Sequence, residues 1–214
     1  MAAALFLIGL HLYWGMALFA LRFIDPPTTG VQIQRRIESF FTRGAYKKRQ
    51  TFLPLRRISL QLQHAVIAAE DGNFYKHYGI DWGQVQDAIE ESAETGEPPR
   101  GASTIPQQLV KNLFFTTHRN PLRKAAEYTL APMAVMILGR NRLLELYLNV
   151  IEWGPGIFGA EAAAEYHYHT SAAALNRDQS TRLAAILPSP RRRKPDRMSQ
   201  FSAIIQDRMR LLGW

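Results

Sequence analysis

Two acidic side chains stand where an apolar run of the sequence ends. The stretch AAEDGNFYKHYGI, residues 68–80, carries Glu70 and Asp71 just before Gly72. The apolar residues before the pair recur at helical spacing and a glycine often ends a helix, so we expect both carboxylates in a last helical turn. Partial burial raises the pKa of a carboxyl group and suits it to act as a general base near neutral pH. Taken alone, Glu70 would be interpreted as a solvated acid at a helix end.

A basic field lies further along the chain. From residue 100 to residue 142 the only acidic side chain is Glu127. Arginine and lysine clamp phosphate groups through charge-assisted hydrogen bonds, so this field favours a phosphate or pyrophosphate ligand. The alternative for Glu127 is a simple pairing with Arg123 and Lys124, which precede it by four and three residues on a helix. The basic residues of the field are Arg100, Lys111, Arg119, Arg123, Lys124, Arg140 and Arg142.

The elements that must position these groups are expected to be helices. Ser103 is the expected N-cap of a helix in GASTIPQQLVKN. Gln107, Gln108 and Lys111 would then share one face of that helix, as a binding face or as ordinary surface polar residues. The pair Asn-Pro at residues 120–121 is typical of the start of the next helix. We find no strand-rich region and no internal repeat, so the expected fold class is mainly α.

Length and composition set the outer limits. The 214 residues are 47% apolar, enough for one folded domain with an appendage. The chain has no cysteine, which excludes disulfides, thiol nucleophiles and thiolate metal sites. A formal net charge of +8 indicates an anionic partner, which could be a nucleic acid, a membrane surface or a phosphate-bearing substrate.

The N-terminal segment AAALFLIGLHLYWGMALFAL, residues 2–21, carries no formally charged side chain. At a rise of ~1.5 Å per residue such a helix matches the ~30 Å hydrocarbon layer of a membrane, so we expect a membrane span. Cleavage as a signal peptide is disfavoured because no basic residue precedes Arg22 and no cleavage site follows. A buried core helix is the alternative, because Tyr13 and Trp14 lie in mid-span rather than at an interface.

The chain is therefore expected to divide into a transmembrane anchor over residues 1–22, a linker over residues 23–30 and a folded domain over residues 31–214. The beginning of the domain, residues 35–57, contains eight basic residues and one acid, interleaved with aromatic residues. This mixture suits a surface that faces anionic lipid headgroups. An ordinary solvated face and a single-stranded nucleic-acid site are the alternatives.

Five segments, in order, resemble the motifs of the peptidoglycan glycosyltransferases, the lipid II polymerases related to the N-terminal domain of bifunctional penicillin-binding proteins. EDGNFYKHYG is similar to their EDxxFxxHxG motif, GASTIPQQLVKN to GxSTxxQQxxKN, and RKAAE to RKxxE. LLELYLN and RLAAILPSP resemble the fourth and fifth motifs, and the order holds from about residue 58 to residue 190. No S-x-x-K is present, so a transpeptidase domain is not expected and the chain resembles the monofunctional members.

The resemblance implies a mainly α, lysozyme-like glycosyltransferase domain with a smaller membrane-associated lobe, preceded by one transmembrane helix. It implies polymerisation of lipid II, in which the acceptor 4-hydroxyl attacks the anomeric carbon of the growing chain with inversion and releases undecaprenyl pyrophosphate. The catalytic domain would lie on the periplasmic side of the bacterial inner membrane. The implied partners are lipid II, the growing lipid-linked glycan, membrane lipids and other cell-wall synthesis or division proteins, with no nucleic acid.

The resemblance also implies residue roles. Glu70 matches the general base of the family, and Glu127 matches its second essential glutamate, which is linked to a divalent metal, Mg²⁺ or Mn²⁺. Local capping is the alternative for Asp71, packing for Phe74, and hydrogen-bonding support of the cleft for His77. The residues expected to bind substrate are Asp71, Phe74, His77, Ser103, Thr104, Gln107, Gln108, Lys111, Asn112, Arg119, Arg123, Lys124 and Arg182.

Some positions depart from the family pattern. Arg140 stands where a lysine usually precedes the fourth motif, which keeps the charge and changes the geometry. Two other functions stay open at this point. One is glycan cleavage by a muramidase or lytic transglycosylase, against which the basic field argues because cleavage needs no pyrophosphate donor. The other is a non-catalytic scaffold that binds lipid II.

Overall fold

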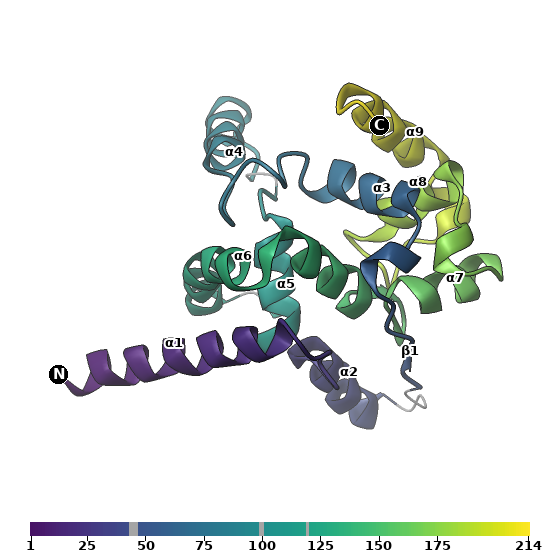
Figure 1. The fold of residues 1–214 in the computed structure, drawn as a ribbon. Helices are drawn as coiled ribbons and strands as arrows, with labels where there is room; N and C mark the ends of the chain where they lie inside the picture. The colour runs from purple at the N-terminus through teal and green to yellow at the C-terminus, as the bar shows by residue number, and fades with distance from the viewer. Residues whose placement is uncertain (43–46, 99–100, 119) are drawn as a thin grey trace.

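The computed structural model describes residues 1–42, 47–98, 101–118 and 120–214, and of Ala3 and Ala4 it describes only the backbone. The chain is mainly helical, as expected (Figure 1). In chain order the helices are α1 (Ala2–Leu21), α2 (Gly30–Phe41), α3 (Leu60–Glu70), α4 (Trp82–Thr95), α5 (Ile105–Phe114), α6 (Pro121–Val150), α7 (Ala160–Tyr168), α8 (Arg177–Ile186) and α9 (Ser199–Leu211), with short 3-10 helices at Leu55–Arg57, Ala172–Ala174 and Pro195–Arg197.

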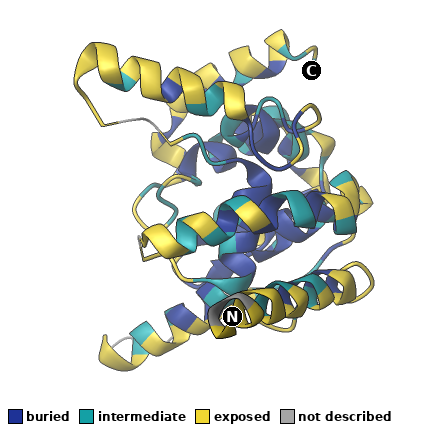
Figure 2. Ribbon diagram, turned by 90° about the vertical axis from the view of Figure 1, so that its left-hand side faces the viewer, coloured by how far each residue is buried: buried dark blue, intermediate teal, exposed yellow. Residues whose placement is uncertain are grey.

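The core lies where α5 packs on α6 and where α3 packs on α8 and α9. Leu109 and Val110 of α5 and Leu144 of α6 are buried there, because apolar residues recur along one face of each helix. Figure 2 shows this buried centre between outer helices whose surfaces are exposed. The core therefore fixes the ends of α3, α5 and α6 relative to one another.

A small three-stranded sheet joins distant parts of the chain. Strand β1 (Arg49–Gln50) pairs in parallel with β3 (Ile157–Phe158), and β3 pairs antiparallel with β2 (Glu152–Gly154). The order is β1-β3-β2. The sheet connects the segment after α2 to the hairpin after α6, which brings side chains of α2 next to β2.

Helix α6 changes direction at Gly139. The backbone there has φ 71° and ψ 164°, a conformation that glycine adopts readily because it has no Cβ. The first half of α6 begins at Asn120, whose side chain accepts the N–H of Leu122, with Pro121 at the first helical position. This is the helix start that the sequence predicted.

Helix α1 extends outward from the body, with the N-terminus at its far end (Figure 1). Trp14 and Leu18 are buried in the core, whereas Phe6 and Tyr13 are exposed. His11 Nε2 lies 3.1 Å from Thr129 Oγ1 of α6, so side-chain contacts also join the two helices. Among the described residues, no helix has the combination of length and apolarity required to cross a membrane. The expected membrane span is therefore not confirmed.

Helix α2 turns polar side chains inward and apolar side chains outward. Gln32 and Gln34 are buried, and Gln34 Nε2 donates to Thr117 Oγ1 at 2.8 Å. The apolar side chains on its exposed side are Ile33, Ile37, Phe40 and Phe41. An amphipathic helix on a water-facing surface normally has the opposite arrangement.

Candidate active site

Glu70 is the last residue of α3, so a helix of the core delivers this carboxylate. Gln108 Nε2 of α5 donates to Glu70 Oε2 at 2.7 Å. Burial raises the pKa of Glu70 above its ordinary value, while the Gln108 hydrogen bond and the charge of Lys111 act in the opposite direction. A half-buried carboxylate with a raised pKa is suited to accept a proton near neutral pH.

Asp71 has a different environment from its neighbour. Its side chain is 2% exposed and both oxygens are engaged, Oδ1 by His77 Nε2 at 2.8 Å and Oδ2 by the N–H of Ile105 at 2.9 Å. His77 Nδ1 accepts the N–H of Gly79 at 3.1 Å, so Nε2 carries the hydrogen that is donated to Asp71. These contacts fasten the loop after α3 to the start of α5, in agreement with the capping interpretation of Asp71 and the supporting interpretation of His77.

The same loop is held against α6. A Cβ on Gly79 would lie 2.6 Å from the nitrogen of Pro132, so only glycine allows this close approach. Phe74 is fully buried, with the Arg140 guanidinium 5.2 Å from its ring centroid. Arg140 also donates to the carbonyl oxygen of His77. Phe74 thus packs in the core, and Arg140 holds the loop through the Phe74 ring and the carbonyl oxygen of His77.

The N-terminus of α5 has a capping box. Thr104 Oγ1 accepts the N–H of Gln107, and Gln107 Oε1 accepts the N–H of Thr104 at 3.1 Å. The prediction of Ser103 as the N-cap was wrong by one residue, because Thr104 has the extended backbone and the side-chain bond that define the cap. Thr104 and Gln107 are both buried, so this pair orients α5. Ser103, just before the cap, remains available to other side chains.

Gln108 is the centre of a hydrogen-bond network. Besides Glu70, its Nε2 reaches the carbonyl oxygen of Ser103 at 3.2 Å, and its Oε1 accepts the hydroxyl of Tyr147 at 2.8 Å. Asn112 Nδ2 donates to the backbone oxygen of Gln108 at 2.8 Å and is buried. Gln108 therefore orients Glu70, and Asn112 supports the helix that carries it.

Glu127 is the buried centre of a basic cluster on α6. Its side chain is only 4% exposed. Arg123 NH1 lies 2.6 Å from Oε1, and Lys124 Nζ lies 3.2 Å from Oε2. Lys124 Nζ also donates to Ser103 Oγ at 2.9 Å, which joins the first turn of α6 to the start of α5. The pairing of Glu127 with Arg123 and Lys124, which was the alternative from the sequence, is present. It holds the two cationic side chains in fixed positions.

The side chains around Glu127 do not by themselves fit a resident metal ion. Both carboxylate oxygens already accept from cations. Across the part of the chain that the structure describes, no three His, Cys, Asp or Glu side chains converge as metal ligands. Magnesium in proteins is typically held by one or two carboxylates together with substrate phosphates.

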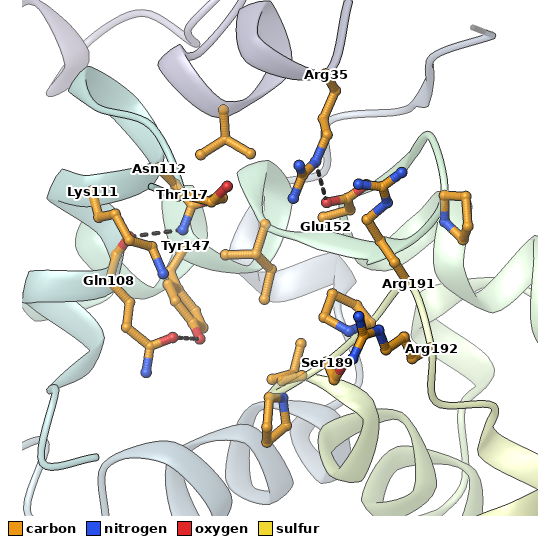
Figure 3. Close-up of a pocket in the computed structure, with 16 residues that line it drawn as sticks. Arg35, Gln108, Lys111, Asn112, Thr117, Tyr147, Glu152, Ser189, Arg191 and Arg192 are labelled. Carbon is orange, nitrogen blue, oxygen red and sulfur yellow. Dashed lines mark hydrogen bonds and ion pairs between the residues drawn. The ribbon is translucent and has the colours of Figure 1, made fainter. Parts of the chain in front are cut away.

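Two adjoining cavities, which together we call the cleft, collect these groups. The first has a volume of about 760 Å³ and is lined by Glu70, Ser103, Lys124 and Glu127 among others. The second has a volume of about 660 Å³ (Figure 3). The two share the lining residues Gln108, Lys111, Thr117, Leu187 and Pro188.

Lys111 stands at the junction of the two cavities. Burial lowers the pKa of Lys111, and the charges of Glu127 and Glu70 partly oppose this change. Within the described residues its ammonium has no hydrogen-bond or ion-pair partner, so it is available to an anionic ligand. Figure 3 places Arg35, Arg191 and Arg192 around the far side of the second cavity. The cleft is thus basic along its length, as the phosphate interpretation requires.

The expected substrate-binding residues that line the cleft are Ser103, Gln108, Lys111, Asn112, Arg123 and Lys124. Those that line neither of its two cavities are Asp71, Phe74, His77, Thr104, Gln107 and Arg182. Arg182 on α8 pairs with Asp178 of its own helix at 2.8 Å and lines neither cavity. Arg119 lies outside the described residues. The remaining assignments to substrate contact stay predictions, because the structure contains no substrate.

Sequence reasoning missed several residues of the cleft. Tyr147 lies in the segment LLELYLN, but its contact with Gln108 joins α6 to α5, and such a contact leaves no local signal in the sequence. Arg35 and Glu152 form an ion pair at 2.9 Å between α2 and β2, which depends on the sheet. Arg191 belongs to a run of basic residues that is indistinguishable in sequence from a solvated surface.

Comparisons with known proteins agree with this geometry. The sequence model of a family described as "Transglycosylase" matches residues 35–212. The chain is 40% identical over 211 residues to a protein named biosynthetic peptidoglycan transglycosylase from Ectopseudomonas mendocina, covering 97% of this chain and 87% of that protein. A protein of the same name from Methylobacillus flagellatus is 48% identical over 159 residues, 72% of this chain and 69% of that protein. One from Dechloromonas aromatica is 40% identical over 209 residues, 96% of this chain and 87% of that protein.

Proposed function

The chain belongs to the transglycosylase family, and from this premise we propose that its cleft polymerises lipid II with Glu70 as the general base. The activity is that of a peptidoglycan glycosyltransferase in bacterial cell-wall synthesis. One observation carries the residue assignment: Glu70 lines the same cavity as Lys124 and Glu127 of the basic cluster. A proton acceptor and a binding site for a pyrophosphate thus face one space.

The acceptor hydroxyl is activated at Glu70. A sugar hydroxyl is a weak nucleophile until a positioned base takes its proton. As the acceptor 4-oxygen forms a bond to the anomeric carbon, the proton passes to Glu70 and the bond from that carbon to the pyrophosphate oxygen breaks. The leaving pyrophosphate takes the electron pair, and attack from the opposite face inverts the anomeric centre.

The leaving pyrophosphate needs charge stabilisation. Lys111 and Lys124 both line the cavity that Glu70 lines. Lys111 has no protein partner within the described residues, and Lys124 is held by Ser103 and Glu127. Preorganised cations of this kind stabilise developing negative charge without reorganisation. Glu127 holds Arg123 and Lys124 in place and prevents their mutual repulsion from dispersing them.

We propose a divalent metal, Mg²⁺ or Mn²⁺, only as an ion that binds together with the substrate. Glu127 could share such an ion with phosphate oxygens of the donor, in keeping with the usual ligands of magnesium. The protein side chains alone do not fit a metal, so no step of the reaction is assigned to it.

We also propose that the protein works at the periplasmic surface of the inner membrane, anchored by a single span in α1. The support for membrane association is the row of exposed apolar side chains on α1, continued by Ile37, Phe40 and Phe41 on α2. The proposed arrangement is lysozyme-like, with α2 in the smaller lobe next to the lipid and the span in α1 preceding that lobe. Its partners are lipid II, the growing glycan and membrane lipids, with other cell-wall synthesis or division proteins as further partners.

The experiment compares the wild-type protein with Glu70→Gln in detergent-solubilised lipid II with Mg²⁺. We expect glycan polymer from the wild type and none from the variant, with an unchanged circular dichroism spectrum. Glu165→Gln, an exposed glutamate of α7, is the matched control and should polymerise like the wild type.

Polymer from Glu70→Gln at a near wild-type rate would exclude Glu70 as the base. Release of soluble fragments from mature peptidoglycan, without polymer from lipid II, would support glycan cleavage instead. Binding of lipid II without turnover by the wild type would support a scaffold.

A further inference from the structure

Two hydrogen bonds in series connect Tyr147 to Glu70. The Tyr147 hydroxyl donates to Gln108 Oε1 at 2.8 Å, and Gln108 Nε2 donates to Glu70 Oε2 at 2.7 Å. Tyr147 is 1% exposed and belongs to the second half of α6, whereas Gln108 belongs to α5 and Glu70 ends α3. Three helices therefore meet at one amide group.

An amide side chain presents its oxygen or its NH₂ group, depending on its rotation. If the Gln108 amide were turned over, its oxygen would face the Glu70 carboxylate, and two acceptors would oppose each other. Tyr147 favours the observed orientation, because its hydroxyl donates to Oε1 while Nε2 donates to Glu70 and to the carbonyl oxygen of Ser103. Burial raises the pKa of Tyr147 well above its ordinary value, and the charges of Glu70 and Asp71 add to this, so the hydroxyl keeps its hydrogen.

We propose that Tyr147 is a positioning residue for the transfer reaction, which fixes the orientation of the Gln108 amide and thereby the ionisation of Glu70. The orientation of the Glu70 carboxylate follows from these two hydrogen bonds. That Glu70 accepts the proton of the acceptor hydroxyl rests on the proposed function. Among the described residues Glu70 Oε1 has no hydrogen-bond partner. Tyr147 and Gln108 thus hold Oε2 and leave Oε1 for the acceptor hydroxyl.

The other charges that face Glu70 come from several elements. They are Asp71 at the end of α3, Lys111 on α5 and Arg193 after α8. Arg208 on α9 lines a smaller cavity on which Glu70 also borders. None of these groups contacts the Tyr147 hydroxyl, which bonds to Gln108. A change at Tyr147 therefore reaches Glu70 through the amide.

The first test is a direct titration of Glu70 that does not depend on activity. The carboxyl carbon of Glu70 is followed by ¹³C NMR in the detergent-solubilised full chain and assigned by its loss in Glu70→Gln. In Tyr147→Phe we expect its pKa to rise by about 1 unit, because the amide that donates to the carboxylate is no longer held in its orientation. Tyr168→Phe, which removes another buried hydroxyl outside the cleft, should leave the titration unchanged.

The second test is the pH profile of polymerisation. In Tyr147→Phe the acidic limb of the plot of kcat against pH should move to higher pH. For a shift of about 1 pH unit, kcat at acidic pH should fall about 10-fold, while KM for lipid II changes little. Loss of rate at all pH values with an unmoved acid limb would show a merely structural role and overturn the proposal. An unchanged titration and an unchanged rate would also overturn it.

A double variant separates a relay through Gln108 from any other effect, and Gln108→Leu alone tests the amide if Tyr147→Phe folds poorly. Gln108→Leu removes the amide from Glu70 and should raise its pKa in the same direction. Adding Tyr147→Phe to Gln108→Leu should produce no further shift, because the amide through which Tyr147 acts is absent. A further shift would mean that Tyr147 acts on Glu70 by another route. If the wild type makes no polymer, the proposed function fails, and the NMR titrations still decide the role of Tyr147.

Discussion

Asp71 Oδ2 accepts the backbone N–H of Ile105 at 2.9 Å, and this bond joins the end of α3 to the first residue of α5. Glu70 and Gln108 lie one residue before and three residues after these two positions. The contact between Glu70, the proposed base, and its amide partner Gln108 therefore depends on a neighbouring buried bond. Asp71 is thus expected to affect the proposed reaction through its position in the fold.

Replacing Asp71 with Asn should destabilise the protein. The new amide oxygen can accept the N–H of Ile105, but the new NH₂ group then faces the hydrogen on His77 Nε2. A change of the His77 tautomer would move the conflict to the N–H of Gly79, so one buried donor is left without a partner. We expect a loss of about 1–3 kcal/mol in the free energy of unfolding, measured by urea denaturation.

The control for this variant is Asp87→Asn, at an exposed position of α4. It should change the free energy of unfolding by less than about 0.5 kcal/mol. Equal effects of the two substitutions would mean that the Asp71 contacts do not stabilise the junction of α3 and α5.

Glu70 should make stability depend on pH in a defined direction. Its pKa is raised in the folded protein, so between the unfolded-state pKa of ~4.3 and the raised value the folded state binds more protons than the unfolded state. Stability due to this group is thus fully present at low pH and is lost as the pH rises through the raised pKa. Glu70→Gln should therefore be more stable than the wild type at neutral pH, and the difference should vanish below about pH 4.

The measurement is a series of urea denaturation curves from pH 3.5 to pH 8 for the wild type and both glutamine variants. Glu165→Gln should follow the wild type at every pH, because Glu165 is exposed. If the free energy of unfolding of the wild type and of Glu70→Gln changed with pH in the same way, Glu70 would have its ordinary pKa in the folded protein.

Much of the fold followed from local sequence signals. The helix that ends at Glu70 and the helix start at Asn120 and Pro121 could be predicted, because spacing, capping and stop residues act within a few positions. The same local rules misplaced the N-cap of α5 by one residue. Ser103 and Thr104 are both good caps, but Gln107, three residues after Thr104, completes a capping box with it, whereas the residue three after Ser103 is Pro106, which has no N–H. The Thr104 hydroxyl also donates to the carbonyl oxygen of Gly79.

The candidate site was predictable where its residues lie in motifs and not where it depends on packing. Glu70, Lys124 and Glu127 could be named as candidates, because they lie in segments that resemble the motifs of the family. The Tyr147–Gln108 bond joins residues 39 positions apart. The Arg35–Glu152 pair joins residues 117 positions apart. Neither contact has a signature in the sequence, because the two partners meet only after the helices and the sheet have packed.

Removal of divalent metal should affect turnover and not folding. The proposed ion is held together with donor phosphates, and the described residues contain no group of three ligating side chains. We therefore expect EDTA to slow polymerisation of lipid II by the wild type, and Mg²⁺ to restore the rate. The Tm of the substrate-free protein should be the same in EDTA and in Mg²⁺. A marked increase of Tm with Mg²⁺ alone would reveal a site built by the protein itself.

The outward-facing apolar side chains of α2 should enter a lipid surface. The chain has no cysteine, so a single introduced cysteine can carry an environment-sensitive fluorophore. A label at Phe40→Cys, where the native side chain is 79% exposed, should show blue-shifted emission in vesicles that contain anionic lipid and should be quenched by nitroxide-bearing acyl chains. A label at Ile204→Cys on α9, on the opposite side of the molecule in Figure 1, should emit as it does in water. Basic residues beside α2 should make the depth of the Phe40 label sensitive to the fraction of anionic lipid. Identical emission from the two labels would contradict a membrane-facing α2, whatever α1 does.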